Sequence, residues 1–331
     1  MTDLYPAFAQ QLDALQAPQG HLFVACLGGG ADSQSILDLL DRYRQQQPQY
    51  RYLAIHLDHQ FHPHSGHWAA GLVADCQRRN MPLVHEVLQI NSGPRVNKEA
   101  AGRDARYHRM AALLHADTVA AGVSCLLGHH RNDQIETVLL QLKRGAGPKG
   151  LAAMAAQQDW QQVRWLRPLL TVSKQAIYAY AEQRQLFWIE DDTNFDTDIE
   201  RNFLRHKVVP LLEQRWPHFG EAVLRSAALC AEQHDLLNEL LAEQMAPHIN
   251  DQQQLFVDHI ARWSAPKQRA ALRYWLQQCQ QPMPSYAQLE QLRQQFLHTS
   301  NDAKPLYRCR WYSITRSKAR WLTVSPTLSP R

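Results

Sequence analysis

The chain has 331 residues, of which 45% are hydrophobic and 20% charged, with a formal net charge of +4 at pH 7. This length predicts two domains, and the composition is typical of a globular protein with enough apolar residues for a core. No apolar run approaches the ~20 residues of a membrane helix, and no basic stretch predicts a signal peptide. The six cysteines include no C-x-x-C pair, which argues against disulfides, a zinc ribbon or an iron–sulfur cluster and predicts a cytoplasmic protein.

A glycine-rich loop near the start of the chain follows an apolar run of strand length, Leu22–Leu27. The apolar pattern of residues 36–40 predicts a helix, so the order is strand, tight loop, helix. Glycines let the backbone approach a ligand, and the amides of the loop and helix N-terminus attract an anion such as phosphate. Neither the dinucleotide fingerprint nor the Walker pattern is present, and an ordinary glycine-rich turn is the alternative. The loop consists of Gly28, Gly29, Gly30, Ala31, Asp32 and Ser33.

Strands and helices alternate along the first 130 residues. The predicted elements are a helix at Tyr5–Leu15, a strand at Leu22–Leu27, a helix that ends near Arg44, a strand at Tyr50–Leu57, a helix at Gly66–Arg79, a strand at Pro82–Val87, a helix at Asn97–Leu114 and a strand at Val119–Leu127. This alternation predicts an α/β fold with right-handed crossovers and a doubly wound parallel sheet. Ligands of such sheets bind at the carboxyl ends of the strands, where the glycine loop, Asp58–His59 and His129–His130 are expected to converge.

The segment after the fourth predicted strand carries a second group of candidate catalytic residues. A helix is predicted to begin near Asn132 or Asp133, which are both good N-cap residues. Asp133, Glu136 and Thr137 are spaced i, i+3 and i+4 and therefore share one face of its first turns. Next to His130, these carboxylates can hold Mg²⁺ and leave its other positions to phosphate and water. The alternative is that they interact only with the helix dipole.

Several of these segments resemble known families. The loop Gly28–Ser33 is similar to the phosphate loop of the PP-loop ATP pyrophosphatases, and His130–Thr137 with Leu142–Gly147 resembles the tRNA(Ile)-lysidine synthetases. Further segments match the latter family in order, namely Glu99–Tyr107, Arg167–Leu170, Trp188–Asn194 and Arg201–Arg205. The resemblance runs from about residue 20 to about residue 230 and is specific as a set, whereas each motif alone is weak.

The resemblance implies a PP-loop domain of the adenine nucleotide alpha hydrolase-like fold and a ligase activity. Members of this family use ATP and Mg²⁺ to attach L-lysine to C2 of the wobble cytidine in the CAU anticodon of isoleucine tRNA. AMP is transferred to the cytidine oxygen with release of diphosphate, and the lysine amine then displaces AMP. The implied partners are this tRNA and L-lysine, without a membrane, and the oligomeric state is left open, with a homodimer as one alternative.

The matched motifs also imply roles for individual residues. The implied catalytic residues are Asp32, His130, Asp133, Glu136, Lys143 and Arg144. ATP is expected to contact Gly28, Gly29, Gly30, Ala31, Asp32, Ser33, Asp58 and His59. The substrate is expected at Arg103, Arg106, Arg201, Asn202 and Arg205, and Mg²⁺ at Asp133 and Glu136.

The sequence departs from the family pattern at three places in or next to the expected ATP site. Gly28 stands where the family has serine, and Asn132 stands where it has the first of two adjacent aspartates. After His59, Gln60 and Phe61 replace a Gly-Leu pair. Because losing one hydrogen bond to a charged group costs ~1.5–3 kcal/mol, a tRNA-binding paralogue with a decayed ATP site is an alternative to the active enzyme. A tRNA cytidine thiolase of the same fold is a weaker alternative, because such relatives use paired cysteines.

The second half of the chain has a different character. We expect a catalytic domain at 1–215, a connecting helix at 216–245 and a smaller, mainly helical tRNA-binding domain at 246–331 with a strand pair near 306–324. This half loosely resembles the family's substrate-binding domain, in a short form that lacks a last C-terminal domain. From residue 301 onward the chain has seven basic residues, one acidic residue and interleaved aromatics. This pattern indicates either an RNA-contacting surface or a solvated basic face over a small aromatic core.

Overall fold

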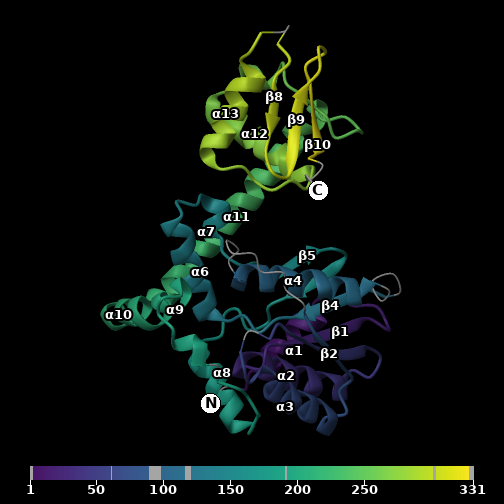
Figure 1. Cartoon of the computed structure of the whole chain (residues 1–331), viewed down its shortest axis with the longest axis vertical. Helices are drawn as coiled ribbons and strands as arrows, with labels where there is room; N and C mark the ends of the chain where they lie inside the picture. Colours follow the sequence, from purple (N-terminus) through teal and green to yellow (C-terminus); the bar gives the residue numbers. More distant parts are fainter. Residues whose placement is uncertain are drawn as a thin grey trace. The chain divides into compact units, whose positions relative to one another are not determined.

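The computed structural model describes residues 3–60, 62–88, 98–115, 121–190, 192–300 and 303–327. The chain forms two compact units, Met1–Cys230 and Ala231–Arg331. Helix α11 (Phe219–Met245) begins in the first unit and ends in the second (Figure 1), so the boundary falls inside the segment expected to be a connecting helix. The parts of the sequence predictions that concern residues 61, 97, 119, 120, 191, 301, 302 and 328–331 lie outside the described residues.

Strands and helices alternate through the first unit, as the sequence predicts (Figure 1). Its elements in chain order are α1 (Tyr5–Asp13), β1 (Leu22–Leu27), α2 (Ala31–Gln46), β2 (Arg51–Asp58), α3 (Ser65–Arg78), β3 (Leu83–Val87), α4 (Lys98–Leu113), β4 (Val123–Leu126), α6 (Arg131–Lys143), α7 (Pro148–Leu151), β5 (Gln157–Trp160), β6 (Val163–Leu166), α8 (Lys174–Gln183), η1 (Asp192–Phe195), α9 (Glu200–Phe203), the π-helical turn η2 (Leu204–Val208) and α10 (Val209–Arg215). Strand β4 is shorter than predicted, because its strand hydrogen bonding begins at Val123.

Six strands of the first unit form one sheet in the order β3-β2-β1-β4-β6-β5. Strands β3, β2, β1, β4 and β6 are parallel to their neighbours, and the edge strand β5 runs antiparallel to β6. The chain leaves β1 toward β2 and β3 on one side and returns to β4 on the other, so strand order reverses between β1 and β4. The doubly wound, mostly parallel sheet is therefore confirmed. The β5–β6 hairpin was not predicted, because β5 is an exposed polar edge strand without an apolar pattern.

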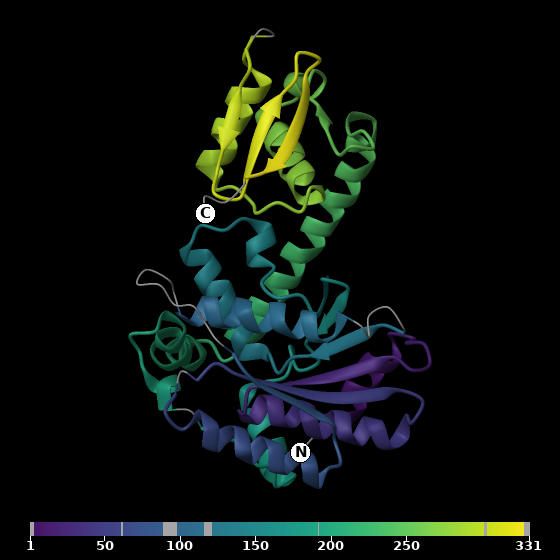
Figure 2. The ribbon, with the colours of Figure 1, turned by 45° about the vertical axis from the view of Figure 1, so that its right-hand side comes forward.

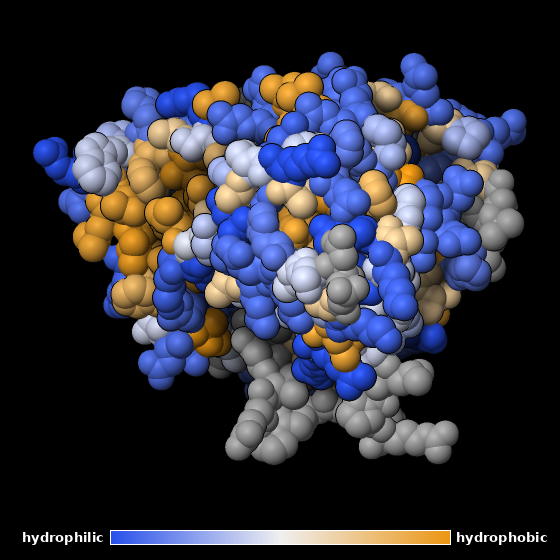
Figure 3. Space-filling view, turned by 90° about the horizontal axis from the view of Figure 1, so that it is seen from above, coloured by the Kyte–Doolittle hydropathy of each residue, from blue (hydrophilic) through white to orange (hydrophobic). Residues whose placement is uncertain are grey.

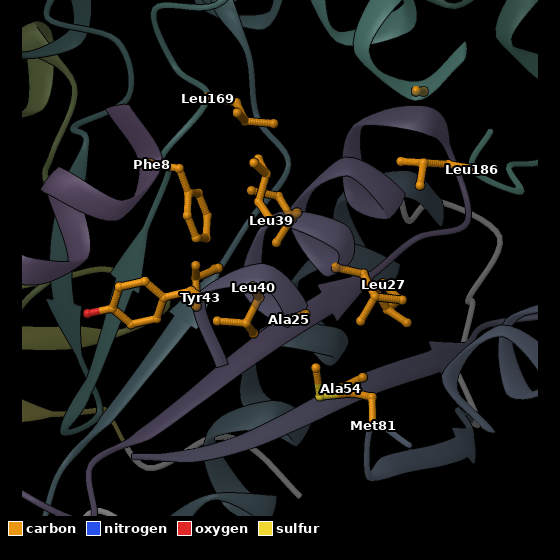
Figure 4. Packing of buried hydrophobic residues seen from close by; sticks show 14 of the residues in the cluster. Phe8, Ala25, Leu27, Leu39, Leu40, Tyr43, Ala54, Met81, Leu169 and Leu186 are labelled. Carbon is orange, nitrogen blue, oxygen red and sulfur yellow. The ribbon is translucent and has the colours of Figure 1, made fainter. Parts of the chain in front are cut away.

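Side chains of β1 alternate between two separate cores. Phe23 and Ala25 pack in a cluster with residues of α1, α2, α3 and α8, whereas Leu22 and Val24 pack in a cluster with residues of α4. Figure 2 shows helices on both faces of the sheet, and Figure 4 shows side chains of α1, β1, α2 and β2 meeting in the first cluster. Because both faces are covered, the strands carry near-continuous apolar runs, and polar residues gather at their ends.

The second unit combines helices with a small antiparallel sheet. Its elements are the end of α11, η3 (Ala246–His248), β7 (Leu255–Phe256), η4 (Ile260–Arg262), α12 (Ala265–Gln278), α13 (Tyr286–Leu297), β8 (Leu306–Arg308), β9 (Tyr312–Arg316) and β10 (Trp321–Pro326). The sheet has the order β7-β10-β9-β8. Where the sequence predicted a pair of strands, the structure has three, β8, β9 and β10, and β7 pairs with β10 as a fourth. Trp275 is fully buried in its core, and its indole N–H donates to the carbonyl of Gln253 at 2.8 Å.

The basic and aromatic residues at the end of the chain divide between core and surface. Tyr307 and Tyr312 are buried in the core of the second unit, as expected for a small aromatic core. Arg316 is also buried, and its guanidinium donates to the carbonyls of Phe296 and Ala303 near the end of α13. By contrast, Trp311 is 56% exposed. The small aromatic core is therefore confirmed for Tyr307 and Tyr312, whereas an RNA-contacting surface among the exposed residues stays a prediction.

The face of the molecule drawn in Figure 3 is mostly polar. Seen from above in Figure 3, hydrophilic residues cover most of the visible face, and hydrophobic residues form separate groups among them. Exposed apolar side chains of this kind are normal in folded proteins, so they carry no functional assignment by themselves. None of the helices in the described parts of the chain is both long and apolar enough to cross a membrane.

A buried carboxylate ties α2 to two other helices of the first unit. Asp38 accepts hydrogen bonds from Arg79 at 2.9 Å, from Tyr180 at 2.7 Å and from Arg184 at 3.0 Å. Burial alone raises the pKa of Asp38, but the hydrogen bonds from Arg184, Tyr180 and Arg79 outweigh burial and hold this pKa below its usual value of 3.8. This cluster fixes the position of α2, and therefore of the glycine loop that precedes it.

We predict that Asp38→Ala lowers the free energy of unfolding by about 3 kcal/mol, because it leaves partly buried guanidinium groups without their carboxylate. Urea denaturation at neutral pH measures this loss. Since the folded-state pKa of Asp38 is lowered, its contribution is complete above its ordinary pKa of 3.8 and is lost as the pH falls toward the folded-state value. The difference between the wild type and Asp38→Ala should therefore shrink in acid.

Asp159→Ala is the matched control, because its ion pair with Arg164 is exposed and should contribute about 0–1 kcal/mol. Equal effects of the two substitutions would contradict the role of Asp38.

Candidate active site

The glycine loop between β1 and α2 has the open backbone geometry of an anion-binding loop. Gly29 has φ +96°, and a Cβ there would lie 2.9 Å from Cδ1 of Ile189. Gly30 is the N-cap of α2, and it has no side chain to accept from the first N–H groups of the helix. Part of the first turn therefore keeps its N–H groups available. The Ser33 hydroxyl accepts from the Gly29 N–H at 3.1 Å and donates to the Gly30 carbonyl at 3.0 Å. Ser33 thus holds the loop through two hydrogen bonds to its backbone.

Two glycines of the site differ in the space around them. A Cβ on Gly28 would have no atom within 4 Å, whereas a Cβ on Gly128 would lie 3.0 Å from the backbone of Asp32 and Ser33. The close approach at Gly128 brings the loop after β4 against the start of α2. The carboxyl ends of β1 and β4 therefore meet, as the sequence predicts. The open space at Gly28 means that a serine side chain fits at this position.

Helix α6 begins with a reciprocal cap between two predicted site residues. His130 is the N-cap, and its backbone N–H donates to Oδ2 of Asp133 at 2.9 Å. In return, Nδ1 of His130 accepts from the Asp133 N–H at 3.4 Å, which leaves the proton of a neutral ring on Nε2. Both side chains are buried. The cap places an imidazole and a carboxylate opposite the glycine loop in fixed orientations.

Glu136 lies one turn further along α6 and is paired with two arginines. Its side chain is 1% exposed. Oε2 accepts from Arg201 at 2.8 Å, and Oε1 accepts from Arg205 at 2.7 Å, with a further bond from Arg205 to Oε2 at 3.0 Å. Arg205 also lies 3.5 Å from Oδ1 of Asp133. The structure thus brings four predicted residues together, and the carboxylate of Glu136 is occupied by guanidinium groups.

Asp32 and Asp133 are close enough for their charges to interact, and their pKa values shift in opposite directions. Burial raises the pKa of Asp32; nearby His130 lowers it and the charge of Asp133 raises it, with a net increase. Burial also raises the pKa of Asp133, but His130 and Arg201 outweigh burial and hold this pKa below its usual range. Two close carboxylates with positive charges beside them are suited to a cation or to a phosphate group that brings one.

Lys174 is a site residue that sequence reasoning missed. It is the first residue of α8, and burial lowers its pKa, as does the nearby Arg205, while Asp32, Glu136 and Asp133 act in the opposite direction. Its ammonium group therefore lies within the field of all three carboxylates. The Arg167–Leu170 motif points to this region, but nothing in the local sequence marks the lysine that follows it.

Asn132, where the family has aspartate, has a structural partner on the same helix α8. Its Oδ1 accepts from the backbone N–H of Lys174 at 3.0 Å. This N–H belongs to the first turn of α8 and has no partner within its own helix. An amide oxygen satisfies it as an aspartate oxygen would, so the substitution keeps this contact and removes one negative charge.

The predicted arginines of α4 lie near the strand ends. Arg103 is 5.8 Å from the ring centroid of Tyr107, and it lies close enough to His129 for its charge to lower the pKa of that ring. Burial lowers the pKa of His129 to about 3, and Arg167 and Arg103 add to this effect, so His129 is neutral at pH 7. Arg106 in turn contributes to the lowered pKa of His56, for which burial is the main cause. Both arginines therefore lie near the carboxyl ends of β4 and β2, at the edge of the sheet where the site was expected.

The end of β2 lies beside the end of β1. Nδ1 of His56 is 3.0 Å from the carbonyl oxygen of Leu27, the last residue before the glycine loop. Asp58 is buried and accepts from the backbone N–H of Gln60 at 2.8 Å, which fixes the turn after the strand. Asp58 and the half-buried His59 are thus close to the loop, in agreement with a place next to a nucleotide.

Lys143 and Arg144 lie apart from this group. Both are exposed, and Lys143 pairs with Glu200. They stand at the C-terminal end of α6, about 15 Å along the helix from Asp133 at 1.5 Å per residue. The helix that places Asp133 and Glu136 at the strand ends therefore directs these two cations elsewhere.

The described residues include no group of three or more His, Cys, Asp or Glu side chains that could hold a metal ion. This is compatible with Mg²⁺, which usually takes one or two carboxylates and completes its shell with phosphates and water. Asp133 fits this requirement, whereas both oxygens of Glu136 already accept from arginines.

Comparisons with known proteins agree with this geometry. Residues 4–212 match the PP-loop domain, and residues 255–321 match the TilS substrate binding domain. The chain is 54% identical over 312 residues to the tRNA(Ile)-lysidine synthase of Idiomarina loihiensis, an alignment that covers 94% of this chain and 68% of that protein. This chain belongs to the tRNA(Ile)-lysidine synthase family.

Other family members give the same result. Identity is 43% over 300 residues to the tRNA(Ile)-lysidine synthase of Serratia proteamaculans, covering 91% of this chain and 67% of that protein. It is 40% over 326 residues to that of Vibrio cholerae, covering 98% and 72%. The chain thus spans about two thirds of the length of these relatives.

The fold also resembles that of a solved thiolase. The U34-tRNA thiolase NcsA from Methanococcus maripaludis, with its [4Fe-4S] cluster, matches with a TM-score of 0.58 and 16% identity, over 69% of this chain and 78% of that chain. At this identity the likeness shows the fold alone. The six cysteines of this family member are free thiols, and the thiolase alternative gains no support beyond the shared fold.

We predict that Gly29→Ala weakens ATP binding at least about tenfold, because a side chain at this positive φ is strained and its Cβ would clash with Ile189. Equilibrium binding of a fluorescent ATP analogue measures the change. Gly28→Ser is the matched control in the same loop, where a Cβ meets no atom within 4 Å, and it should bind ATP at least as tightly as the wild type. Weakening by both substitutions to the same degree would contradict this account of the loop.

Proposed function

We propose that this chain catalyses the reaction of its family, the ATP-dependent ligation of L-lysine to C2 of the wobble cytidine in the CAU anticodon of isoleucine tRNA. Family membership carries the proposal, and the glycine loop facing His130 and Asp133 supports it. In the first step the cytidine O2 attacks the α-phosphate of ATP and diphosphate leaves. In the second step the lysine amine attacks C2, AMP leaves with the oxygen, and the amine loses a proton.

The described residues match the demands of the first step. The amides of Gly28 and Gly30 and the N-terminus of α2 offer donors to the diphosphate, while the Gly29 amide donates to Ser33, which fixes the loop. The negative charge that develops on the leaving diphosphate requires fixed cations, and Arg205 and Lys174 stand beside the carboxylates of the site. Lys143 and Arg144 were also predicted for this role. They lie at the other end of α6, so a substrate bound next to Asp133 would have to reach them with another part of its structure.

Asp133 is the best candidate among the described residues for binding Mg²⁺, and Asp32 lies near enough for the two charges to interact. Mg²⁺ bound there neutralises phosphate charge and orients the leaving group. We assign Glu136 to holding Arg201 and Arg205 rather than to the metal, because its oxygens accept three guanidinium hydrogen bonds.

The second unit is proposed to bind the tRNA. Its exposed Arg308, Arg310 and Trp311, with the Arg310 guanidinium 4.8 Å from the Trp311 ring centroid, suit phosphate and base contacts. The first unit is proposed as the catalytic domain and α11 as the connection. Because the proposed reaction uses ATP and tRNA, we place this protein in the cytoplasm.

The direct test uses purified protein, ATP, Mg²⁺, radiolabelled lysine and an unmodified isoleucine tRNA transcript with a CAU anticodon. We expect lysine incorporation by the wild type and a loss of at least about a hundredfold with Asp133→Asn, which keeps the acceptor for His130 but removes the charge. Asp159→Asn, an exposed carboxylate of β5, is the control and should be fully active. Binding of tRNA without incorporation or release of AMP would instead support a paralogue with a decayed ATP site.

A second prediction concerns Glu136. We expect Glu136→Gln to lower the free energy of unfolding by about 3 kcal/mol, because two guanidinium groups lose their charge partner. The Mg²⁺ concentration for half-maximal activity should remain within about twofold of the wild type, since the substitution removes no metal ligand if Glu136 only holds the arginines. Titration with Mg²⁺ and with Mn²⁺ measures this, and a shift of about tenfold or more would show that Glu136 binds the metal after all.

A further inference from the structure

An aromatic side chain stands exposed on the surface next to the arginine pair. Phe195, the last residue of η1, is 65% exposed. One side of its ring stacks with the ring of His206, with centroids 5.4 Å apart and planes at 27°. A single exposed apolar residue needs no explanation. Phe195 is different because neighbouring side chains hold it in place.

Side chains from the following helix fix the turn that carries Phe195. Asn202 is buried and donates from Nδ2 to the carbonyls of Thr193 and Asp196, both at 2.9 Å. Nε2 of His206 lies 2.8 Å from the carbonyl oxygen of Asn194. The backbone on both sides of Phe195 is therefore held by neighbouring side chains. The ring is presented to solvent in a set orientation.

The same helical segment holds the arginines of the candidate active site. Arg201 and Arg205 are four residues apart and reach Glu136, while Asn202 and His206, also four apart, reach the Phe195 turn. The segment includes the π-helical turn η2, a feature that is frequent at functional sites. One short element thus couples the ring pair Phe195–His206 to the catalytic edge of the sheet.

The surroundings of the ring suit a base better than a phosphate. Asp196 and Asp198 are exposed on the same turn, and their negative charges disfavour a phosphate there. A flat apolar face backed by an imidazole is suited to a neutral π-system. Bases of single-stranded RNA loops stack on such rings, and every base offers a π-face.

We propose that the face of Phe195 opposite His206 stacks with an unpaired base of the RNA substrate, adjacent to the cytidine that reacts. The proposal rests on the proposed function, because it takes an anticodon loop as the substrate. Stacking at this point holds the loop open after the cytidine has left its own stack, so that the cytidine can reach the glycine loop. Phe195 would then be a substrate-positioning residue that touches the RNA and not the ATP.

The test uses a CAU anticodon stem-loop in which 2-aminopurine replaces the adenine next to the wobble cytidine. This fluorophore is quenched when it stacks, so binding to the full-length protein reports on the base directly. We expect Phe195→Ala to raise the Kd for this RNA about tenfold to a hundredfold and to remove the quenching on saturation. Phe195→Tyr, which keeps the ring, should retain both, and the KM for ATP should stay unchanged in all variants.

Leu211→Ala is the matched control, because Leu211 is an equally exposed apolar residue, at 65%, on α10. It should not alter RNA binding. The proposal is overturned if Phe195→Ala behaves as Leu211→Ala, or if it raises the KM for ATP as much as the Kd for RNA, which would indicate a supporting role in the fold. If the wild type forms no lysidine, the proposed function fails, yet the quenching still decides whether Phe195 stacks a base.

Discussion

The pairing of Glu136 with Arg201 and Arg205 is the interaction on which the candidate site depends. A carboxylate that is 1% exposed is tolerated only when its charge is matched and its oxygens accept hydrogen bonds. Here this requirement joins α6, which carries His130 and Asp133, to the segment formed by α9 and η2. The pair therefore fixes two elements that are more than sixty residues apart in sequence.

The electrostatics of the site follow from the way carboxylates and cations are distributed. Asp32 is destabilised as an anion by burial and by Asp133, while Asp133 is stabilised by His130 and Arg201. A divalent cation bound there would relieve the repulsion between the two aspartates, and a bound diphosphate would be next to Arg205 and Lys174. Ligands that arrive together thus balance the charge better than either one alone. This is the arrangement expected for a site that binds a nucleotide with its metal.

The departures from the family pattern have different consequences in the folded chain. Asn132 still satisfies the first N–H of α8, so its effect is confined to the lost negative charge. Gly28 leaves an open space in which no atom would meet a side chain, so the loop geometry does not depend on the missing serine. Neither substitution disturbs the backbone around the glycine loop. The active enzyme is therefore favoured over a decayed paralogue on structural grounds.

The succession of apolar runs and polar residues along the chain was sufficient to predict the sheet and the edge at which the site is expected. Apolar runs ending in Gly28, Asp58 and His129 are local signals, and parallel strands bring such ends together in any doubly wound sheet. The sequence predicted helix α6 but not its N-cap: Asn132 or Asp133 was expected there, whereas the N-cap is His130 and Asp133 lies in the first turn. What only the tertiary structure decided depends on contacts between distant segments: the arginine partners of Glu136 and the place of Lys174 beside three carboxylates. Sequence spacing carries no information on these, because they arise from how α6, α8 and α9 pack together.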